Sequence, residues 1–195
     1  MKEKQFDLSA KEHFGLILEP IGFSVERSRY STFHRQASDD IYHVIMPDLS
    51  SDGTWFDIRV FATSPLIEPQ FDKLFPGDVG IPSDSFSLLH PKFGVGARQQ
   101  KFRCKTEEGF VRNFNKEVVP ALGSKALPYL DGINSLNDLT PYIRRDFYLG
   151  AALWQIGERE KARKILLTEK IRLSNIADET GRVSSLLSYI DSILK

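Results

Sequence analysis

The segment Trp55-Phe56-Asp57-Ile58-Arg59-Val60-Phe61-Ala62 decides the fold class. Apolar side chains fill every second position, which is the side-chain period of a β-strand. The face that we expect in the core carries Phe56, Ile58, Val60 and Ala62. The opposite face mixes aromatic rings with one acid and one base: Trp55, Asp57, Arg59 and Phe61. The alternation predicts a strand with one face covered by helices.

Short links place other strands beside this one. The loop Ser50-Ser51-Asp52-Gly53 is a good hairpin turn, and it follows a predicted strand over residues 41–46 that Pro47 is expected to stop. An earlier strand is predicted over residues 23–36, with a break near 27–28, and Asp39-Asp40 forms the next tight turn. Such short links favour an antiparallel meander.

Helices are predicted before and after this meander in the sequence. The first covers residues 8–19, with Ser9 as N-cap and Glu12 completing a capping box. A second begins after the N-cap candidate Thr106. Its apolar stripe repeats at every fourth residue, and Pro120 and Pro128 are expected to kink or break it. The stripe consists of Phe110, Phe114, Val118 and Leu122.

The stretch from 64 to 94 holds five of the ten prolines and many large apolar side chains. We expect this excursion to pack on the sheet or on a partner, because a solvated loop does not carry so many apolar groups. Short strands are predicted at 85–90 and 97–105.

The C-terminal region reads as helices. A short helix is predicted over 135–139, followed by longer ones over 141–156, 159–175 and 179–194. Leu149-Gly150, Gly157 and Ala162 have the spacing of a helical hairpin whose helices approach closely. The predicted fold class is therefore α+β, with an antiparallel sheet of four or five strands packed by helices (residues 1–131) and a C-terminal all-helical subdomain (132–195).

Composition excludes several classes of protein. Acidic and basic residues balance at 26 each, so no nucleic-acid partner is expected. No apolar run is long enough to span a membrane, and a cytoplasmic protein is the expectation. The one cysteine, Cys104, excludes a disulfide framework and is expected to be a small buried side chain.

The order of the predicted elements resembles a known family. A helix ends in Leu18-Glu19-Pro20-Ile21-Gly22-Phe23, an apolar strand Val44-Ile45-Met46 precedes the aromatic strand 55–60, and a later helix reaches Val119-Pro120-Ala121-Leu122. Over about residues 5–145 this is similar to the bacterial domain-of-unknown-function family 4304 (DUF4304). Pro47-Asp48-Leu49 replaces the polar residues usual in that family. The resemblance implies an α+β fold and assigns no catalytic residue.

Motifs for catalysis, metal or cofactor binding are missing from the sequence. The histidines, His13, His34, His43 and His90, have no metal-binding spacing. We therefore expect no catalytic residue, no metal site and no cofactor. The one candidate ligand site is the outward strand face, where Arg59 would hold an anion, Asp57 would orient a donor, and Trp55 and Phe61 would stack on a ring. The alternative is a cross-strand ion pair, with the surface aromatic rings covered by the excursion over 64–94.

Two functions follow as hypotheses. The first is a non-enzymatic protein-interaction module, either an adaptor or an immunity-like protein, with an unidentified protein partner. The alternative is a small-ligand-binding or enzymatic domain that uses the face of Trp55, Asp57 and Arg59. A third, weaker hypothesis places Arg27, Arg29, Arg35 and Arg59 on one nucleic-acid-binding face. The sequence predicts no oligomeric state.

Overall fold

The structure, a computed structural model, describes residues 1–27, 31–74, 86–87, 102–179 and 181–195. Its strands are β1 Ser24–Arg27, β2 Ser31–Ser38, β3 Ile41–Leu49, β4 Trp55–Thr63, β5 Phe86–Ser87 and β6 Phe102–Arg103. The strand order is β1-β2-β3-β4, and the short strands β5 and β6 both pair with β4. All these pairings are antiparallel, which confirms the predicted class of sheet.

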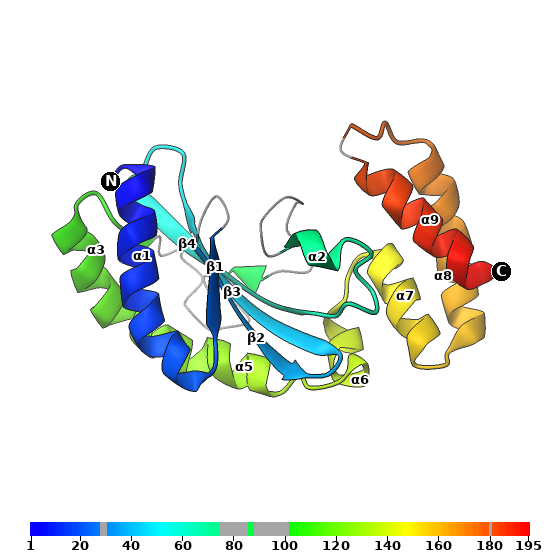
Figure 1. The fold of residues 1–195 in the computed structure, drawn as a ribbon, viewed down its shortest axis with the longest axis horizontal. Coiled ribbons are helices and arrows are strands. Elements are labelled where there is room, and N and C mark those ends of the chain that lie inside the picture. Colours follow the sequence, from blue (N-terminus) through cyan, green and yellow to red (C-terminus); the bar gives the residue numbers. More distant parts are fainter. Residues whose placement is uncertain (28–30, 75–85, 88–101, 180) are drawn as a thin grey trace.

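The helices fall into two groups along the chain. Those before residue 143 are α1 Glu3–Leu18, η1 Glu19–Ile21, α2 Phe71–Leu74, α3 Glu107–Asn113, η3 Phe114–Val118, α4 Val119–Ala121, η4 Leu122–Ala126, α5 Leu127–Asp131, α6 Leu136–Leu139 and η5 Thr140–Tyr142. Those after it are α7 Asp146–Gln155, α8 Arg159–Ser174 and α9 Arg182–Leu194. Figure 1 places α1 and α3 near one end of the sheet and α7–α9 beyond the other.

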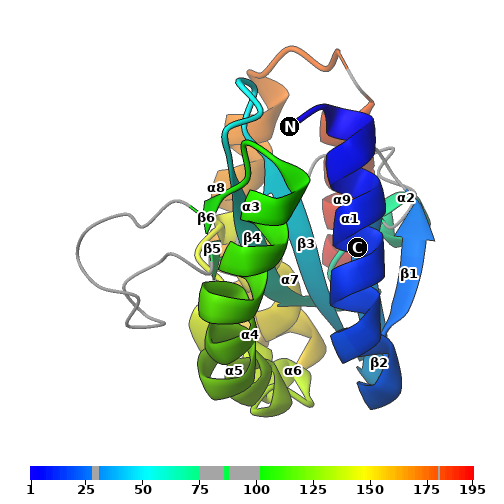
Figure 2. The same ribbon diagram turned by 90° about the vertical axis from the view of Figure 1, so that its left-hand side faces the viewer.

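The core lies between one face of the sheet and the helices α1 and α3–α5, which stand side by side in front of that face in Figure 2. The inward residues of β4 confirm the predicted alternation. Phe56, Ile58 and Val60 are fully buried, and Ala62 is 9% exposed. Removing this apolar surface from water is the main force that holds the layers together.

Four phenylalanines tie β4 to the helices. The ring of Phe56 lies 5.4 Å from Phe6 of α1, 5.2 Å from Phe110 of α3 and 5.4 Å from Phe102 of β6. The rings of Phe6 and Phe110 meet edge to face at 5.8 Å. Such tilted ring pairs add attraction beyond simple burial, so Phe56 is the centre of the core at this end of the sheet.

The first helix begins earlier than predicted. It starts at Glu3, and its N-cap residue Lys2 makes no side-chain cap. Ser9 is instead buried inside the helix, and its hydroxyl donates to Glu107 at 3.5 Å. The prediction was wrong because Phe6 and Ala10 are buried, so the apolar face extends one turn upstream of the expected cap.

The predicted strand over 23–36 is two antiparallel strands, β1 and β2, whose connection at 28–30 lies outside the described residues. The predicted stop at Pro47 was also wrong. β3 continues to Leu49, and Pro47 pairs with Ile58 of β4. Pro47 lies beyond Ile45, the last residue of β3 with a partner in β2. Here β3 behaves as an edge strand, which tolerates the missing N–H.

The helix that starts after Thr106 runs through both prolines. Thr106 caps it as predicted, accepting from the backbone N–H of Gly109 at 3.1 Å. Two wide π turns, η3 and η4, end two residues before Pro120 and Pro128 respectively. A proline ring clashes with the carbonyl four residues before it. These carbonyls belong to Lys116 and Ser124, inside the π turns, where the wider backbone leaves room for the ring.

The π turns also keep one face of this helix buried. On a regular α-helix, a repeat of four residues rotates by about 40° at each step. Six residues at this spacing would therefore spiral out of the core. Instead all six are at most 1% exposed: Phe110, Phe114, Val118, Leu122, Ala126 and Leu130. The wide turns absorb the excess rotation, and the helix continues where a break was predicted.

Helices α7 and α8 form the predicted close pair. Gly157 ends α7 with a φ of 91°, in the left-handed region. At Gly150 an added Cβ would lie 2.7 Å from the Cγ and Cδ2 of Leu166, a side chain that is fully buried. The absence of a side chain at Gly150 therefore sets the distance between the two helices.

Because of this contact, we expect alanine substitution to have opposite effects on stability at two glycines. Gly150→Ala is expected to lower the free energy of unfolding by about 1 kcal/mol, because overpacking against Leu166 exceeds the gain in helix propensity. Gly123→Ala, where nothing lies within 4 Å of the added Cβ, is expected to raise it by about 0.5–1 kcal/mol. Urea unfolding measures both changes. A Gly150→Ala variant as stable as the unmodified chain would contradict the close approach of α7 and α8.

The predicted excursion is described only in part. Residues 64–74 continue from β4 into α2. Of the predicted strand at 85–90 the described residues contain β5, and of the one at 97–105 they contain β6. The short helix predicted at 135–139 is confirmed by α6, which Ser135 caps.

Candidate functional site

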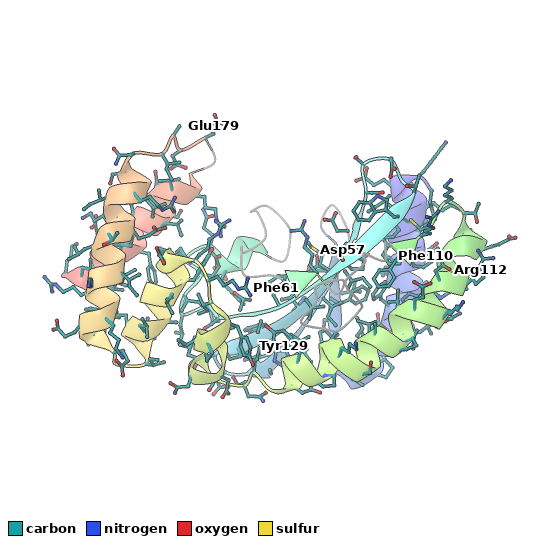
Figure 3. The ribbon with its side chains drawn as sticks, turned by 180° about the vertical axis from the view of Figure 1, so that it is seen from behind. Asp57, Phe61, Phe110, Arg112, Tyr129 and Glu179 are labelled. Carbon is teal, nitrogen blue, oxygen red and sulfur yellow. The ribbon has the colours of Figure 1, made fainter. Side chains whose placement is uncertain are left out.

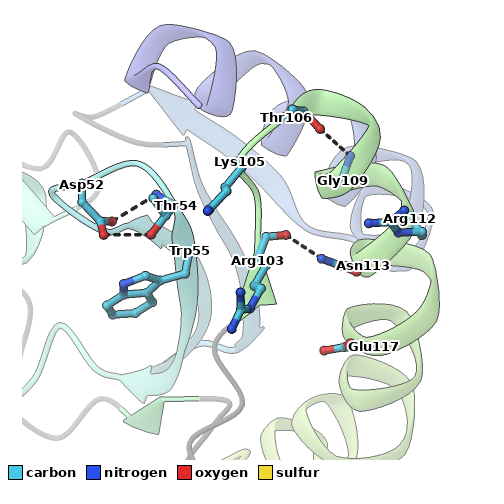
Figure 4. Close-up of a pocket in the computed structure, with 10 residues that line it drawn as sticks. All are labelled: Asp52, Thr54, Trp55, Arg103, Lys105, Thr106, Gly109, Arg112, Asn113 and Glu117. Atoms are coloured by element: carbon cyan, nitrogen blue, oxygen red, sulfur yellow. Dashed lines mark hydrogen bonds between the residues drawn. The ribbon is translucent and has the colours of Figure 1, made fainter.

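A pocket of about 990 Å³ lies at the edge of the sheet beside β6; we call it the edge pocket. Its described lining comes from the β3–β4 hairpin, from β6 and from α3 and η3 (Figure 4). These residues are Asp52, Thr54, Trp55, Arg103, Lys105, Thr106, Gly109, Arg112, Asn113 and Glu117. The volume is at the upper end of the range found for small-molecule sites.

Pairing between β4 and β6 brings the main groups together. Trp55 is directly opposite Arg103 in this antiparallel pair, so both side chains lie on the same face of the sheet. Lys105 follows two residues later, and Figure 4 shows it and Arg103 extending between the hairpin and the helix. The indole, the guanidinium and the ammonium group thus border one space.

Backbone contacts hold this part of the pocket in place. The Asn113 side chain donates to the carbonyl of Arg103 at 2.7 Å, and the backbone N–H of Cys104 donates to the carbonyl of Thr54 at 3.0 Å. The short strand is therefore fixed to the helix on one side and to the hairpin on the other.

Basic side chains outnumber acidic ones among the described residues of the lining. In the part of the chain that the structure describes, Arg103, Lys105 and Arg112 form no ion pair. The carboxylate of Asp52 serves its own turn, where it accepts from the Ser50 hydroxyl at 2.6 Å and the Thr54 hydroxyl at 2.8 Å. In the described lining, three cations therefore stand beside two carboxylates, and one of these carboxylates already accepts hydrogen bonds within the hairpin.

The four predicted site residues do not share one pocket. Only Trp55 lines the edge pocket. Arg59 pairs with Asp48 of β3 at 3.0 Å, which is the cross-strand ion pair given as the alternative. Asp57 is half-buried, and its Oδ1 accepts from the backbone N–H of Ile58 at 2.7 Å. Phe61, farther along β4 in Figure 3, is 3% exposed and borders a separate cavity of about 20 Å³.

Arg35 was wrongly expected to add charge near Arg59. It lies on the opposite, helix-covered face, because it pairs in register with the inward residue His43. Its Nε donates to His43 Nδ1 at 3.2 Å, and its guanidinium pairs with Asp131. His43 is 1% exposed, and its Nε2 meets the carbonyl of Ile133 at 2.7 Å. Since Nδ1 accepts, we assign the proton to Nε2.

Cys104 takes a structural position in the core. Cys104 is fully buried, as predicted, and burial raises the pKa of its thiol to about 11. The thiol therefore stays protonated and is a poor nucleophile. Among the described residues, no cluster of three or more His, Cys, Asp or Glu side chains is placed to hold a metal ion. His90 and Arg29 lie outside those residues.

No pattern in the sequence singled out the candidate site residues Arg103, Lys105 and Arg112. Arg103 and Lys105 do alternate in a predicted strand, which was the available signal. Their placement beside Trp55 depends on the register of β6 against β4, which the sequence does not contain.

Comparisons with known proteins add no relative. No family model, no curated protein and no solved structure matches this chain. The resemblance to family 4304 therefore stays a prediction. Among the described residues, no helix has the length and hydropathy that a bilayer crossing requires.

Proposed function

We propose that the chain binds a small anion that carries a flat ring, such as a nucleoside phosphate, in the edge pocket. The observation that carries this proposal is the pairing of Trp55 with Arg103 across β4 and β6, with Lys105 next to them. This is the ligand-binding alternative of the sequence analysis, moved from the middle of β4 to its N-terminal end.

The chemistry of the three side chains supports such a ligand. A guanidinium binds phosphate or carboxylate through two parallel hydrogen bonds, and an ammonium adds a point charge. An indole offers a flat surface on which an unsaturated ring stacks. Glu117, on the helix side of the pocket, can accept a hydrogen bond from an amine or hydroxyl of the ligand.

Adenosine 5′-monophosphate is a suitable probe because it carries both groups. The chain has two tryptophans, and a Trp154→Phe background leaves Trp55 as the only indole reporter. Binding is expected to quench Trp55 fluorescence. Arg103→Gln/Lys105→Gln is expected to weaken binding at least tenfold, since each charged hydrogen bond contributes about 1.5–3 kcal/mol.

A matched control removes the same charge elsewhere. Arg163 and Lys164 are exposed cations on α8, outside the edge pocket, so Arg163→Gln/Lys164→Gln is expected to leave the dissociation constant unchanged. Ribose 5-phosphate and adenosine, each with one of the two groups, are expected to bind more weakly than the monophosphate. If both double variants lost affinity equally, binding would depend only on the net charge of the chain.

Protein interaction, the first hypothesis from the sequence, is a second candidate function. One observation favours it: the outer face of α8 exposes Leu167 and Ile171, one turn apart, at 44% and 69%. Arg163 and Lys164 precede them by one turn and form no ion pair with a described residue. Aliphatic side chains beside unneutralised cations fit an acidic amphipathic segment of a partner.

Co-purification from the source organism tests this second function. Leu167→Ser/Ile171→Ser is expected to lose a stoichiometric partner that the unmodified chain retains. Recovery of the unmodified chain alone, at native levels, would count against a protein partner on α8.

A further inference from the structure

A buried carboxylate lies where the sheet meets the C-terminal helices. Glu68, in the segment that leaves β4, is 1% exposed. Its Oε2 accepts from the Tyr148 hydroxyl of α7 at 2.7 Å and from Arg182 of α9 at 2.9 Å. Its Oε1 accepts from the backbone N–H of Gln70 at 3.1 Å. A carboxylate removed from water is tolerated only with such partners.

The same face of α9 makes further polar contacts with this segment. Arg182, Ser185 and Tyr189 are spaced by three and four residues, so they share one side of the helix. The Gln70 side chain donates to the Ser185 hydroxyl at 3.0 Å, and the Tyr189 hydroxyl donates to the carbonyl of Leu66. Burial raises the pKa of Tyr148 above its ordinary value, so this hydroxyl remains a donor. Several hydrogen bonds therefore join residues 66–70 to α7 and α9; we call this contact the joint.

Apolar side chains also pack between the sheet region and α7–α9, and a small gap lies among them. A cavity of about 20 Å³ remains between β4 and α7, and its lining includes Phe61, Ile67, Ile143 and Tyr148. That volume is about enough for one water molecule. A small gap therefore remains in otherwise buried packing at this point.

A single short segment connects the sheet region to α7–α9. Within residues 1–195 the chain passes from the sheet region to α7–α9 once, through residues 143–145. Ile143 and Arg145 are extended there, with ψ of 125° and 130°. By contrast, α7 and α8 pack closely at Gly150, and α9 packs against α8 with Ile190 fully buried. The three helices are held to one another independently of Glu68.

We propose that α7–α9 form an arm that swings as one body about residues 143–145, and that Glu68, Tyr148 and Arg182 are the latch that holds it closed. Opening separates Tyr148 from Phe61 and Ile67 and brings these buried apolar side chains into contact with water. The latch thus controls the exposure of an apolar surface at the end of the sheet. Polar contacts suit this role because their geometry specifies a single closed position.

Hydrogen–deuterium exchange of the full chain tests the latch. Two variants weaken it: Arg182→Met removes the cation, and Tyr148→Phe removes only a hydroxyl. Either is expected to speed exchange about tenfold or more in residues 64–70 and 143–148, because the local opening equilibrium shifts by the lost charged hydrogen bond. Exchange inside the arm, at 150–153 and 162–169, is expected to stay slow. Binding of the dye ANS is expected to rise in parallel.

Lys170→Gln is the matched control, since it breaks an exposed ion pair within the arm. It is expected to leave exchange at 64–70 unchanged. Unchanged exchange there in both latch variants would overturn the latch. Equal acceleration throughout α7 and α8 would overturn the swinging body, because the helices would then unfold and not move together. If Arg182→Met fails to fold, Tyr148→Phe alone decides.

Discussion

Phe56→Ala is expected to lower the free energy of unfolding by about 3–5 kcal/mol, the typical cost of removing a fully buried phenylalanine. The loss is expected at the high end of that range because three rings, Phe6, Phe102 and Phe110, lie within 5.4 Å of the Phe56 ring. Domains of this size are stable by only about 5–15 kcal/mol. Urea unfolding followed by circular dichroism measures the change.

Two further variants make this result interpretable. Leu16→Ala, at a position that is 71% exposed on α1, is expected to change the stability by no more than about 0.5 kcal/mol. Phe56→Leu keeps much of the volume and is expected to cost about 1–2 kcal/mol. A Phe56→Ala variant that loses no more than Leu16→Ala would mean that β4 does not organise the core.

Acidification is the second large effect expected. Burial lowers the pKa of His43 below 6.5, and the same cause lowers that of His34. At pH values below 6.5, the unfolded chain binds protons that the folded chain does not. The unfolded state is therefore favoured as the pH falls through 6.5, by up to about 1.4 kcal/mol per pH unit for each histidine. Above that pH both states are neutral at these sites, and their contribution is constant.

Urea unfolding at pH 7.5 and pH 5.5 measures this loss, whose upper limit over this interval is about 1.4 kcal/mol for each histidine. In His43→Gln the amide can donate to the carbonyl of Ile133 without titrating, and the pH dependence of the stability is expected to become smaller. A stability that rises on acidification would contradict the assigned burial of His43 beside the cationic Arg35.

Local sequence patterns predicted an element correctly where a single physical effect determines its structure. The alternation of β4 predicted which of its residues are buried, and Thr106 predicted the start of a helix. Pro120 and Pro128 misled the prediction, because the rule that proline ends a helix assumes a regular α-helix. The strict spacing of four along the buried stripe, continued at Ala126 and Leu130, was the signal that the helix includes π turns.

The candidate site was only partly within reach of the sequence. Trp55 stood out, but Arg103 joins it through a two-residue strand separated from it by nearly fifty residues. The latch spans still greater separations, 80 residues from Glu68 to Tyr148 and 114 from Glu68 to Arg182. Contacts between residues so far apart in the sequence depend on how the layers pack together. No periodic pattern in the sequence indicates that packing.

The most direct test of the account is a nuclear magnetic resonance titration of the isotope-labelled chain with adenosine 5′-monophosphate. If the edge pocket binds the ring and the anion, the largest shifts will fall on the indole N–H of Trp55 and on the backbone amides of Thr54, Arg103 and Asn113. Amides around Arg163 and Lys164 of α8 will not move. Shifts centred on α8, or no saturable shift at all, would contradict a ligand site at the edge of the sheet.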